Sequence, residues 1–164
     1  MLKNDYETIR NSEEFRKMFS GCFLVSCFLN ETSGNEENSS WEYNFYSKET
    51  KQTNSFVIKD GKVILRDKSE LTGKKEPEEL ILDNLSLRKA QIMPIIKAYM
   101  KEEQKNEKIS KVILVVESED YNIIWSVILI LNSSKIIKLK IDDSSFKIAE
   151  KKVISLSEMV AQHR

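Results

Sequence analysis

Three charged residues near the end of the chain have the types and spacing that metal-dependent hydrolysis uses. Asp143, Glu150 and Lys152 follow one another as D-x6-E-x-K. In some nucleases, carboxylates of this kind hold Mg²⁺ and the Lys supports the attacking water. Those sites place the Glu-x-Lys strand within apolar core, whereas Glu150, Lys151 and Lys152 form a run of charges. A solvated edge strand, where Lys also discourages aggregation between sheets, is therefore the favoured interpretation.

A second acidic group offers oxygen ligands of the kind that Ca²⁺ prefers. Glu117, Glu119 and Asp120 cluster in an expected turn. Neither a Gly nor a twelve-residue ligand frame accompanies them. An ordinary acidic turn is therefore the favoured interpretation.

Nucleophilic catalysis has few candidate residues in this chain. The only His is His163, next to the end of the sequence, and Ser-His or Cys-His catalysis needs a positioned base. The four Gly residues stand singly, so no phosphate-binding glycine loop is present. Cys22 and Cys27 are expected on opposite faces of one strand, as buried, inert thiols. We therefore predict no catalytic residue, no cofactor, no metal site and no enzymatic activity.

An aromatic stripe is the only candidate for nucleic-acid binding. Trp41, Tyr43 and Phe45 share one face of an expected strand and could stack on bases. Acidic residues lie beside these rings: Glu36, Glu37, Glu42 and Glu49. The chain has 26 Lys+Arg and 26 Asp+Glu, and this zero formal charge argues against coating nucleic acid or an anionic membrane. We therefore predict that the stripe is core and that there is no nucleic-acid partner.

Length and composition indicate one globular body. The chain has 164 residues and 40% hydrophobic residues, enough for a real core. Its longest nearly apolar runs, residues 22–29 and 123–131, fall far short of the ~20 residues that a membrane helix needs. No secretory signal is visible behind Lys3, so we expect a cytoplasmic protein with no membrane partner. Rich Lys and Glu usage is typical of hyperthermophiles, archaea among them, and an AT-rich genome gives a similar bias.

Hydrophobic patterns place helices and then strands in the first half of the chain. Residues 1–20 predict two helical pieces, with Asn11 and Glu14 as a capping box and Phe15, Met18 and Phe19 as an apolar face. Strands are predicted at residues 22–29, 41–46, 55–59 and 62–65, and the last two are joined by the hairpin signal Asp60-Gly61. Residues 30–40 predict an exposed loop, and residues 66–79 a polar connection.

The second half follows the same plan. Residues 86–105 predict the main helix, with Ser86 as N-cap and a kink at Pro94. Strands are predicted at residues 112–116, 121–131, 136–141 and 146–154, and a frayed helix at 157–164. We therefore predict an α+β protein with an N-terminal αβββ repeat (1–68), a connecting segment (69–84) and a C-terminal αβββ repeat (85–164).

Two landmarks support an internal duplication. Trp41 and Trp125 begin matching strands with an offset of 125 − 41 = 84. The turns at Asp60-Gly61 and Asp142-Asp143 give 142 − 60 = 82. Two near-equal offsets are the signature of a repeat, although the identity between the halves is low.

This pattern resembles tandem PepSY-like domains of the cystatin-like fold class. The C-terminal copy carries Trp125 and alternating apolar residues, then residues 138–141 before Asp142; the helix entry from Ser86 to Ala90 is also similar. The second turn departs from the family pattern, because Ser145 stands where Gly is usual. The resemblance implies helix-plus-antiparallel-sheet repeats packed as one compact unit, and a noncatalytic module often linked to peptidase regulation. The Gln-x-Val-x-Gly hairpin of cystatin inhibitors is absent.

The strand at residues 121–131 is apolar on both faces, which predicts an interface. Ile124, Ile128 and Ile130 point away from the face that holds Trp125. Either the N-terminal repeat or a second chain should cover them, and we expect both packing between the sheets and a homodimer. The predicted function is a noncatalytic module that binds or regulates a protein or peptide. The alternative is a small-ligand-binding or enzymatic domain with a concave sheet pocket.

Overall fold

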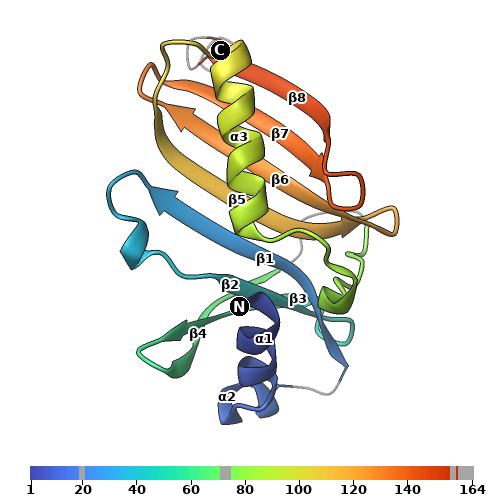
Figure 1. Ribbon diagram of the computed structural model, residues 1–164. Coiled ribbons are helices and arrows are strands. Elements are labelled where there is room, and N and C mark those ends of the chain that lie inside the picture. Colours follow the sequence, from blue (N-terminus) through green and yellow to red (C-terminus); the bar gives the residue numbers. More distant parts are fainter. Residues whose placement is uncertain (19–20, 71–74, 156–157, 159–164) are drawn as a thin grey trace.

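The computed structural model describes residues 1–18, 21–70, 75–155 and 158, and it has the α+β fold predicted from the sequence (Figure 1). The first half contains helices α1 (Leu2–Arg10) and α2 (Glu13–Arg16), then strands β1 (Cys22–Thr32), β2 (Glu42–Ser47), β3 (Gln52–Lys59) and β4 (Lys62–Glu70). The second half contains α3 (Lys89–Glu103), then β5 (Ile109–Glu119), β6 (Asn122–Leu131), β7 (Lys135–Asp142) and β8 (Ile148–Ser155). Short 3-10 turns lie at η1 (Glu36–Asn38) and η2 (Leu82–Asn84).

The strands form one antiparallel sheet with the order β4-β3-β2-β1-β5-β6-β7-β8. Each half contributes four consecutive strands, and the two halves meet where β1 pairs with β5. The expectation that one repeat would fold over the sheet face of the other is therefore wrong. The halves join edge to edge, because the free edge of the first strand in each half pairs with its counterpart.

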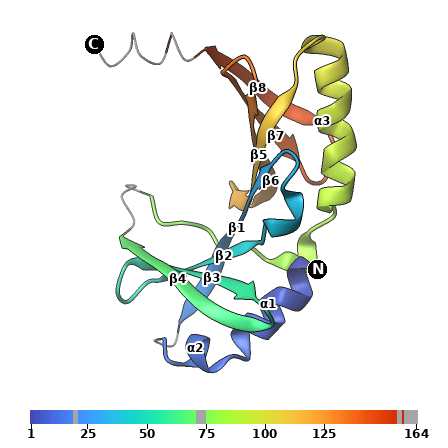
Figure 2. The same ribbon diagram turned by 90° about the vertical axis from the view of Figure 1, so that its left-hand side faces the viewer.

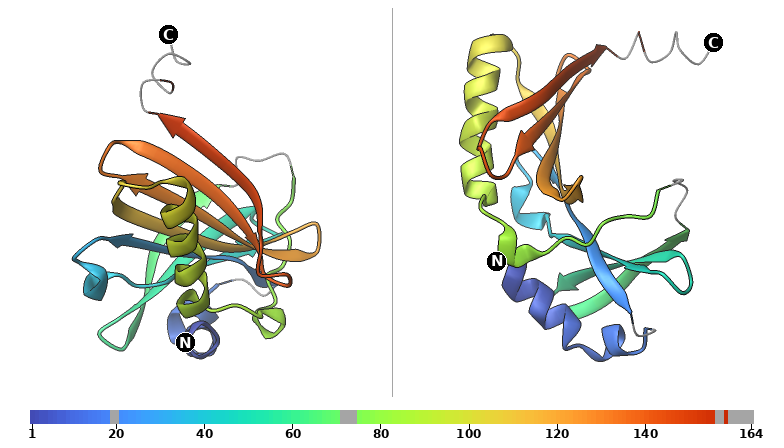
Figure 3. Two further views of the ribbon diagram at one scale, coloured as in Figure 1. Left: turned by 45° about the horizontal axis from the view of Figure 1, so that its top comes forward. Right: turned by 90° about the vertical axis from the view of Figure 1, so that its right-hand side faces the viewer.

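The three α-helices among the described residues lie on one face of the sheet, and the opposite face is concave. Figure 2 shows α3 against one side of β5–β8, α1 and α2 on the corresponding side of β1–β4, and the other side open. The right-hand view of Figure 3 shows that the sheet bends, so that its β8 end and its β3–β4 end turn toward the helix-free side. We call these two sides the helix face and the helix-free face.

The core on the helix face is continuous across both halves. Trp41 and Trp125 meet edge to face, with ring centroids 6.2 Å apart. Both are buried, at 7% and 0% exposed. Tyr43 and Phe45 are also buried, which confirms that the aromatic stripe is core.

Helix α3 begins at Lys89, later than the Ser86 that the capping pattern predicts. The backbone N–H groups of Ser86 and Leu87 instead donate to the carboxylate of Asp143, so these residues precede the helix. The Arg88 N–H donates to Gln91 Oε1 at 2.8 Å and satisfies the actual start of the helix. The helix continues as one element through Pro94.

Several predicted boundaries also move. The N-cap of α2 is Ser12, whose Oγ accepts the N–H of Phe15, rather than Asn11. Strand β1 continues to Thr32 and β4 to Glu70, so both enter segments predicted as loop or connection. Phe19, His163 and most of the predicted C-terminal helix lie outside the described residues.

Candidate functional site

Strand register defines which side chains lie on the helix-free face. Along β6, Trp125, Val127, Leu129 and Leu131 are buried in the core, while the alternate residues are half-buried. Side chains alternate across a strand, so these alternate residues and their partners in neighbouring strands lie on the helix-free face.

Apolar side chains form a patch at the middle of this face. Phe28 pairs with Val115, Ile113 with Ile128, and Ile130 with Ile136. We call these residues the apolar patch: Phe28, Ile113, Val115, Ile128, Ile130 and Ile136. All of them are half-buried, because sheet neighbours screen them and no described helix lies over them. The prediction that β6 is apolar on its far face is confirmed.

A row of polar side chains lies beside the apolar patch on the N-terminal half. Ser26 pairs with Asn44, and Asn44 pairs with Ser55. Asn44 donates from Nδ2 to Ser26 Oγ at 3.0 Å and accepts from Ser55 Oγ at 2.5 Å. This hydrogen-bonded polar row spans three strands and was not predicted. The available signal was the polar alternation at positions 42 and 44.

The polar row lies at the centre of an acidic pocket of about 550 Å³. Five carboxylate residues line the pocket: Glu42, Asp67, Glu70, Glu78 and Glu117. Arg66 neutralises part of this charge, since its guanidinium lies 3.2 Å from Glu42 Oε2. The remaining carboxylates make the pocket suited to a cationic group that also forms hydrogen bonds.

Glu78 fixes one wall of the acidic pocket. Its carboxylate accepts the backbone N–H of Tyr121 and the hydroxyl of Ser118, both at 2.9 Å. The Tyr121 N–H first, then Ser118 and nearby Lys75, lower the pKa of Glu78 below its ordinary value despite partial desolvation. The ionised carboxylate of Glu78 thereby holds the connecting segment against the end of β5.

The structure does not bring the D-x6-E-x-K residues together. Asp143 is 3% exposed, and its carboxylate accepts from the N–H groups of Ser86 and Leu87 and from Trp125 Nε1–H at 3.0 Å. Glu150 and Lys152 pair with Lys140 and Lys138, which lie on the helix-free face. Asp143 therefore ties the entry of α3 to the core, and the other two residues lie on the opposite side of the sheet.

The residues of the acidic turn have lysine or hydroxyl partners. Glu119 binds the ammonium of Lys140 at 2.8 Å, and Asp120 lies 3.5 Å from that of Lys75. Glu117 accepts the hydroxyl of Ser126 at 3.4 Å. Over the described ranges, no group of three or more His, Cys, Asp or Glu side chains is arranged to hold a metal ion.

The two cysteines lie on the same face, so their predicted opposition is wrong. A β-bulge between Leu24 and Ser26 shifts the alternation of β1, which places Cys22 as well as Cys27 against the helix-face core. Cys27 is fully buried, and burial raises the pKa of its thiol far above the ordinary value. This agrees with the interpretation of Cys27 as an inert thiol.

Buried Glu31 joins the two halves at the helix face. Its carboxylate binds the ammonium of Lys89 in α3 and accepts the hydroxyl of Ser39 at 3.0 Å. Glu31 was predicted in an exposed loop. The ion pair across the halves explains why it is 7% exposed instead.

No protein-family model and no curated protein sequence matches this chain. A crystal structure of a "putative lipoprotein" from Clostridium difficile 630 has a similar fold, with a TM-score of 0.61 over 93% of this chain and 92% of that chain. The sequence identity is 9%, so the likeness concerns the fold alone. Both halves of the sheet thus occur together in a second protein. Among the described residues, no helix has the length and apolar character needed to cross a membrane.

Proposed function

We propose that this protein is a noncatalytic binding module whose helix-free face holds a protein partner. The observation that carries the proposal is the apolar patch, which stays uncovered in the described chain. Exposed apolar surface of this kind marks an interaction site more often than a catalytic one.

The acidic pocket beside the apolar patch defines the chemistry of that partner. A complementary surface carries apolar side chains next to basic ones, because Glu117 lines the acidic pocket and lies on the same strand face as Val115 of the apolar patch. Complementary charge selects among partners and fixes their orientation.

A second copy of this chain offers such a surface. On the helix-free face, Lys138 of β7 pairs directly with Lys152 of β8, and Ile136 lies one step along the strand on the same side. Two like charges directly opposite each other destabilise a sheet unless an anion lies nearby. A twofold arrangement that sets these lysines against the acidic pocket of the other copy satisfies both charges. We therefore propose a homodimer through the helix-free face.

Catalysis is the less favoured alternative, for a specific reason. An enzymatic pocket in this fold would need convergent buried carboxylates, and the buried carboxylates of the described chain are Glu31 and Asp143. Both are held by structural hydrogen bonds or ion pairs outside the acidic pocket. Small-ligand binding on the polar row is supported by its hydrogen-bonding groups, and it would use the same pocket.

Light scattering on a sizing column tests the homodimer. We expect a mass near twice 19.1 kDa, which falls toward 19.1 kDa with rising salt. Glu117→Lys and Lys138→Glu should each weaken the dimer, and an equimolar mixture of these two variants should restore it. Ile81→Asp is the control, because Ile81 is 49% exposed on the connecting segment. A wild-type monomer at millimolar concentration would reject a second copy as the partner.

We further propose that each half is a PepSY-like unit and that the partner belongs to peptidase regulation. The contact between Trp41, which directly precedes β2, and Trp125, which lies in β6, supports the first part, since each Trp belongs to the second-strand region of its half. The cytoplasmic location stays a prediction, and the lipoprotein description of the structural neighbour offers a competing one. Cell fractionation with an antibody to this chain distinguishes them.

A further inference from the structure

A buried amide in β3 has no hydrogen-bond partner among the described residues. Asn54 is 7% exposed, and its side chain bonds to no other described residue. Its strand partner in β2 is the core residue Phe45, so the side chain of Asn54 lies on the helix face. Strand interiors rarely contain Asn, and buried amides are almost always paired. Asn54 therefore points to a group, not supplied by the described chain, that completes its hydrogen bonds.

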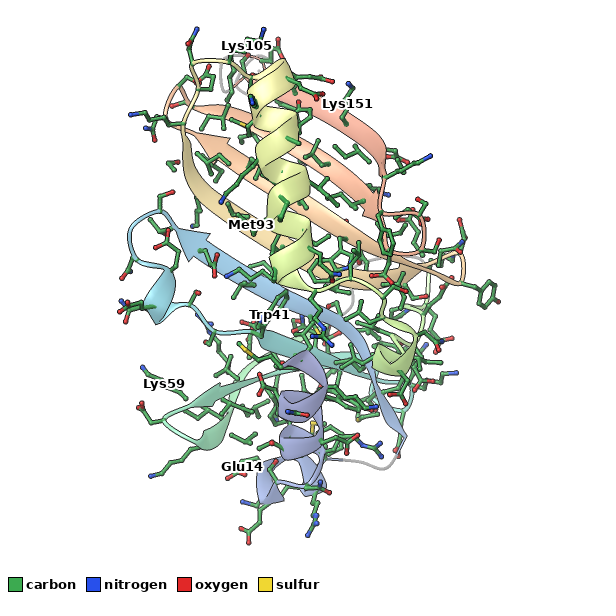
Figure 4. All side chains as sticks on the ribbon, in the orientation of Figure 1. Glu14, Trp41, Lys59, Met93, Lys105 and Lys151 are labelled. Carbon is green, nitrogen blue, oxygen red and sulfur yellow. The ribbon has the colours of Figure 1, made fainter. Side chains whose placement is uncertain are left out.

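Asn54 lines a pocket of about 300 Å³ on the helix face, between α2 and the half-sheet β1–β4. The Oη of Tyr99 also has no partner but is fully enclosed, whereas the polar atoms of Asn54 keep access to their pocket. Glu14, which Figure 4 labels on α2, forms part of the rim. Since a water molecule occupies about 30 Å³ of the liquid, the pocket has room for about ten non-hydrogen atoms.

The exposed rim of this pocket carries an excess of positive charge. Lys17 and Lys68 both line it, and neither ammonium forms a salt bridge with a described residue. Among the described lining residues, the only carboxylate is that of Glu14. Met18 and Leu65 add an apolar wall. The pocket thus joins unpaired cations at the rim, an apolar wall and a buried amide.

We propose that this pocket binds a small organic carboxylate of about ten non-hydrogen atoms. The carboxylate of the ligand faces the ammonium groups of Lys17 and Lys68 at the rim. Its apolar body packs on Met18 and Leu65, and a hydroxyl at its far end bonds to Asn54, whose amide both donates and accepts. A few placed polar groups in an apolar pocket give such a site its specificity. The site lies on the opposite face from the apolar patch and needs none of its residues.

Two hydroxy acids of this size, the rigid para-hydroxybenzoate and the flexible ω-hydroxyhexanoate, are the probes. We expect at least one to bind the full chain with a Kd of about 1 mM or tighter. Benzoate lacks the hydroxyl and para-hydroxybenzamide lacks the charge, so each should bind at least tenfold more weakly than para-hydroxybenzoate. Amide NMR locates the site: the side-chain amide signal of Asn54 should shift, and that of Asn44, on the helix-free face, should stay.

Two lysines of β4 provide a matched pair of variants. Lys68 and Lys62 are both exposed, but of these two Lys68 alone lines the pocket. Lys68→Glu should weaken the binding of the hydroxy acids at least tenfold, because it reverses a charge that faces the carboxylate of the ligand. Lys62→Glu should leave the affinity unchanged. Both side chains are exposed, so neither change removes a core contact.

Asn54→Leu separates the missing partner from ordinary packing, because Leu has nearly the shape of Asn without its polar atoms. Without ligand, the variant should melt about 2–4 °C higher, since it removes an unpaired buried amide. Its affinity for the hydroxy acids should nevertheless fall at least tenfold. A lower melting temperature, equal binding of para-hydroxybenzoate and para-hydroxybenzamide, binding that neither Lys68→Glu nor Asn54→Leu changes, or no hydroxy acid with a Kd of about 1 mM or tighter would each overturn the proposal.

Discussion

The two halves of the molecule build the same half-sheet but cover it differently. In the C-terminal half, the fifteen-residue helix α3 packs aliphatic side chains such as Ile92 and Ile96 onto the sheet. In the N-terminal half, the nine-residue α1 and the four-residue α2 provide less helix. There, aromatic rings fill the space: Tyr6, Phe15, Phe45 and Phe56 pack with centroid distances of 4.8–6.0 Å. Large rings thus compensate for a short helix.

The two halves also differ in the side-chain hydrogen bonds that anchor their helices to the sheet. In the C-terminal half, Asp143 accepts from three donors and fixes the approach to α3. In the N-terminal half, the carboxylate of Asp5 in α1 accepts the hydroxyl of Tyr43 at 3.1 Å. The longer helix therefore has the more heavily bonded entry, and the N-terminal half depends more on packing.

Replacing either of the two contacting tryptophans, one from each half, should cause the largest loss of unfolding free energy. Trp125→Ala should cost about 4–5 kcal/mol of unfolding free energy and Trp41→Ala about 3 kcal/mol, because Trp125 is fully enclosed and Trp41 retains 7% exposure. Urea unfolding at constant m measures both. The rings touch, so the double variant should cost less than the sum of the single variants.

Tyr121→Ala is the control for the tryptophan variants, because Tyr121 is 95% exposed and should change stability by less than ~0.5 kcal/mol. Additive effects of the two Trp variants would show that the two rings are not energetically coupled across the halves. That outcome would contradict a single core.

Replacing the hydrogen-bonding residue that anchors each half, Asp143 or Tyr43, should have an intermediate effect on the free energy of unfolding. Asp143→Asn should cost about 2–3 kcal/mol, since it leaves buried N–H donors facing a poorer acceptor. Tyr43→Phe should cost only about 1 kcal/mol, because it deletes one hydroxyl bond to Asp5. Hydrogen exchange of the Leu87 amide provides a local readout, which should accelerate in Asp143→Asn alone. Equal costs for the two variants would remove the difference between the anchors.

The sequence predicts the elements better than the way they assemble. Alternation identified the strand that contains Phe45, because burial on one face leaves a period of two, and a continuous apolar run identified the strand that contains Trp125. The pairing of β1 with β5 has no local signal, since it joins residues such as Cys27 and Val116 that lie far apart in the chain. Proximity along the sequence could not reveal that one continuous sheet replaces two packed ones.

The candidate sites were hard to predict for a related reason. The polar row of Ser26, Asn44 and Ser55 depends on register across three strands. The bulge in β1 reverses the side on which Cys22 was expected. Ser86 looks like an N-cap until Asp143, from the other end of the half, takes its N–H. In each case a distant contact outweighs a correct local preference.

Acid titration gives the smallest effect and compares a carboxylate that links distant segments with one that acts locally. Glu78 reaches across to Tyr121 and Ser118, whereas Glu36 accepts backbone N–H groups within its own loop. These hydrogen bonds lower the pKa of both carboxyls in the folded protein. A lowered folded pKa contributes stability that is fully present above the unfolded value, about 4.3 for Glu. This stability disappears as the pH falls through the folded pKa.

Glu78→Gln should therefore lower the urea midpoint at pH 7 and leave it nearly equal to that of the wild type at pH 2–3. Glu36→Gln should show the same sign with a smaller shift, because losing a local loop contact frees fewer residues than releasing the connecting segment from β5. Glu79→Gln, next along the chain, is the matched control and should follow the wild-type profile. A Glu78→Gln midpoint that stays parallel to the wild type from pH 7 to pH 3 would show that this carboxylate does not hold the connection in place.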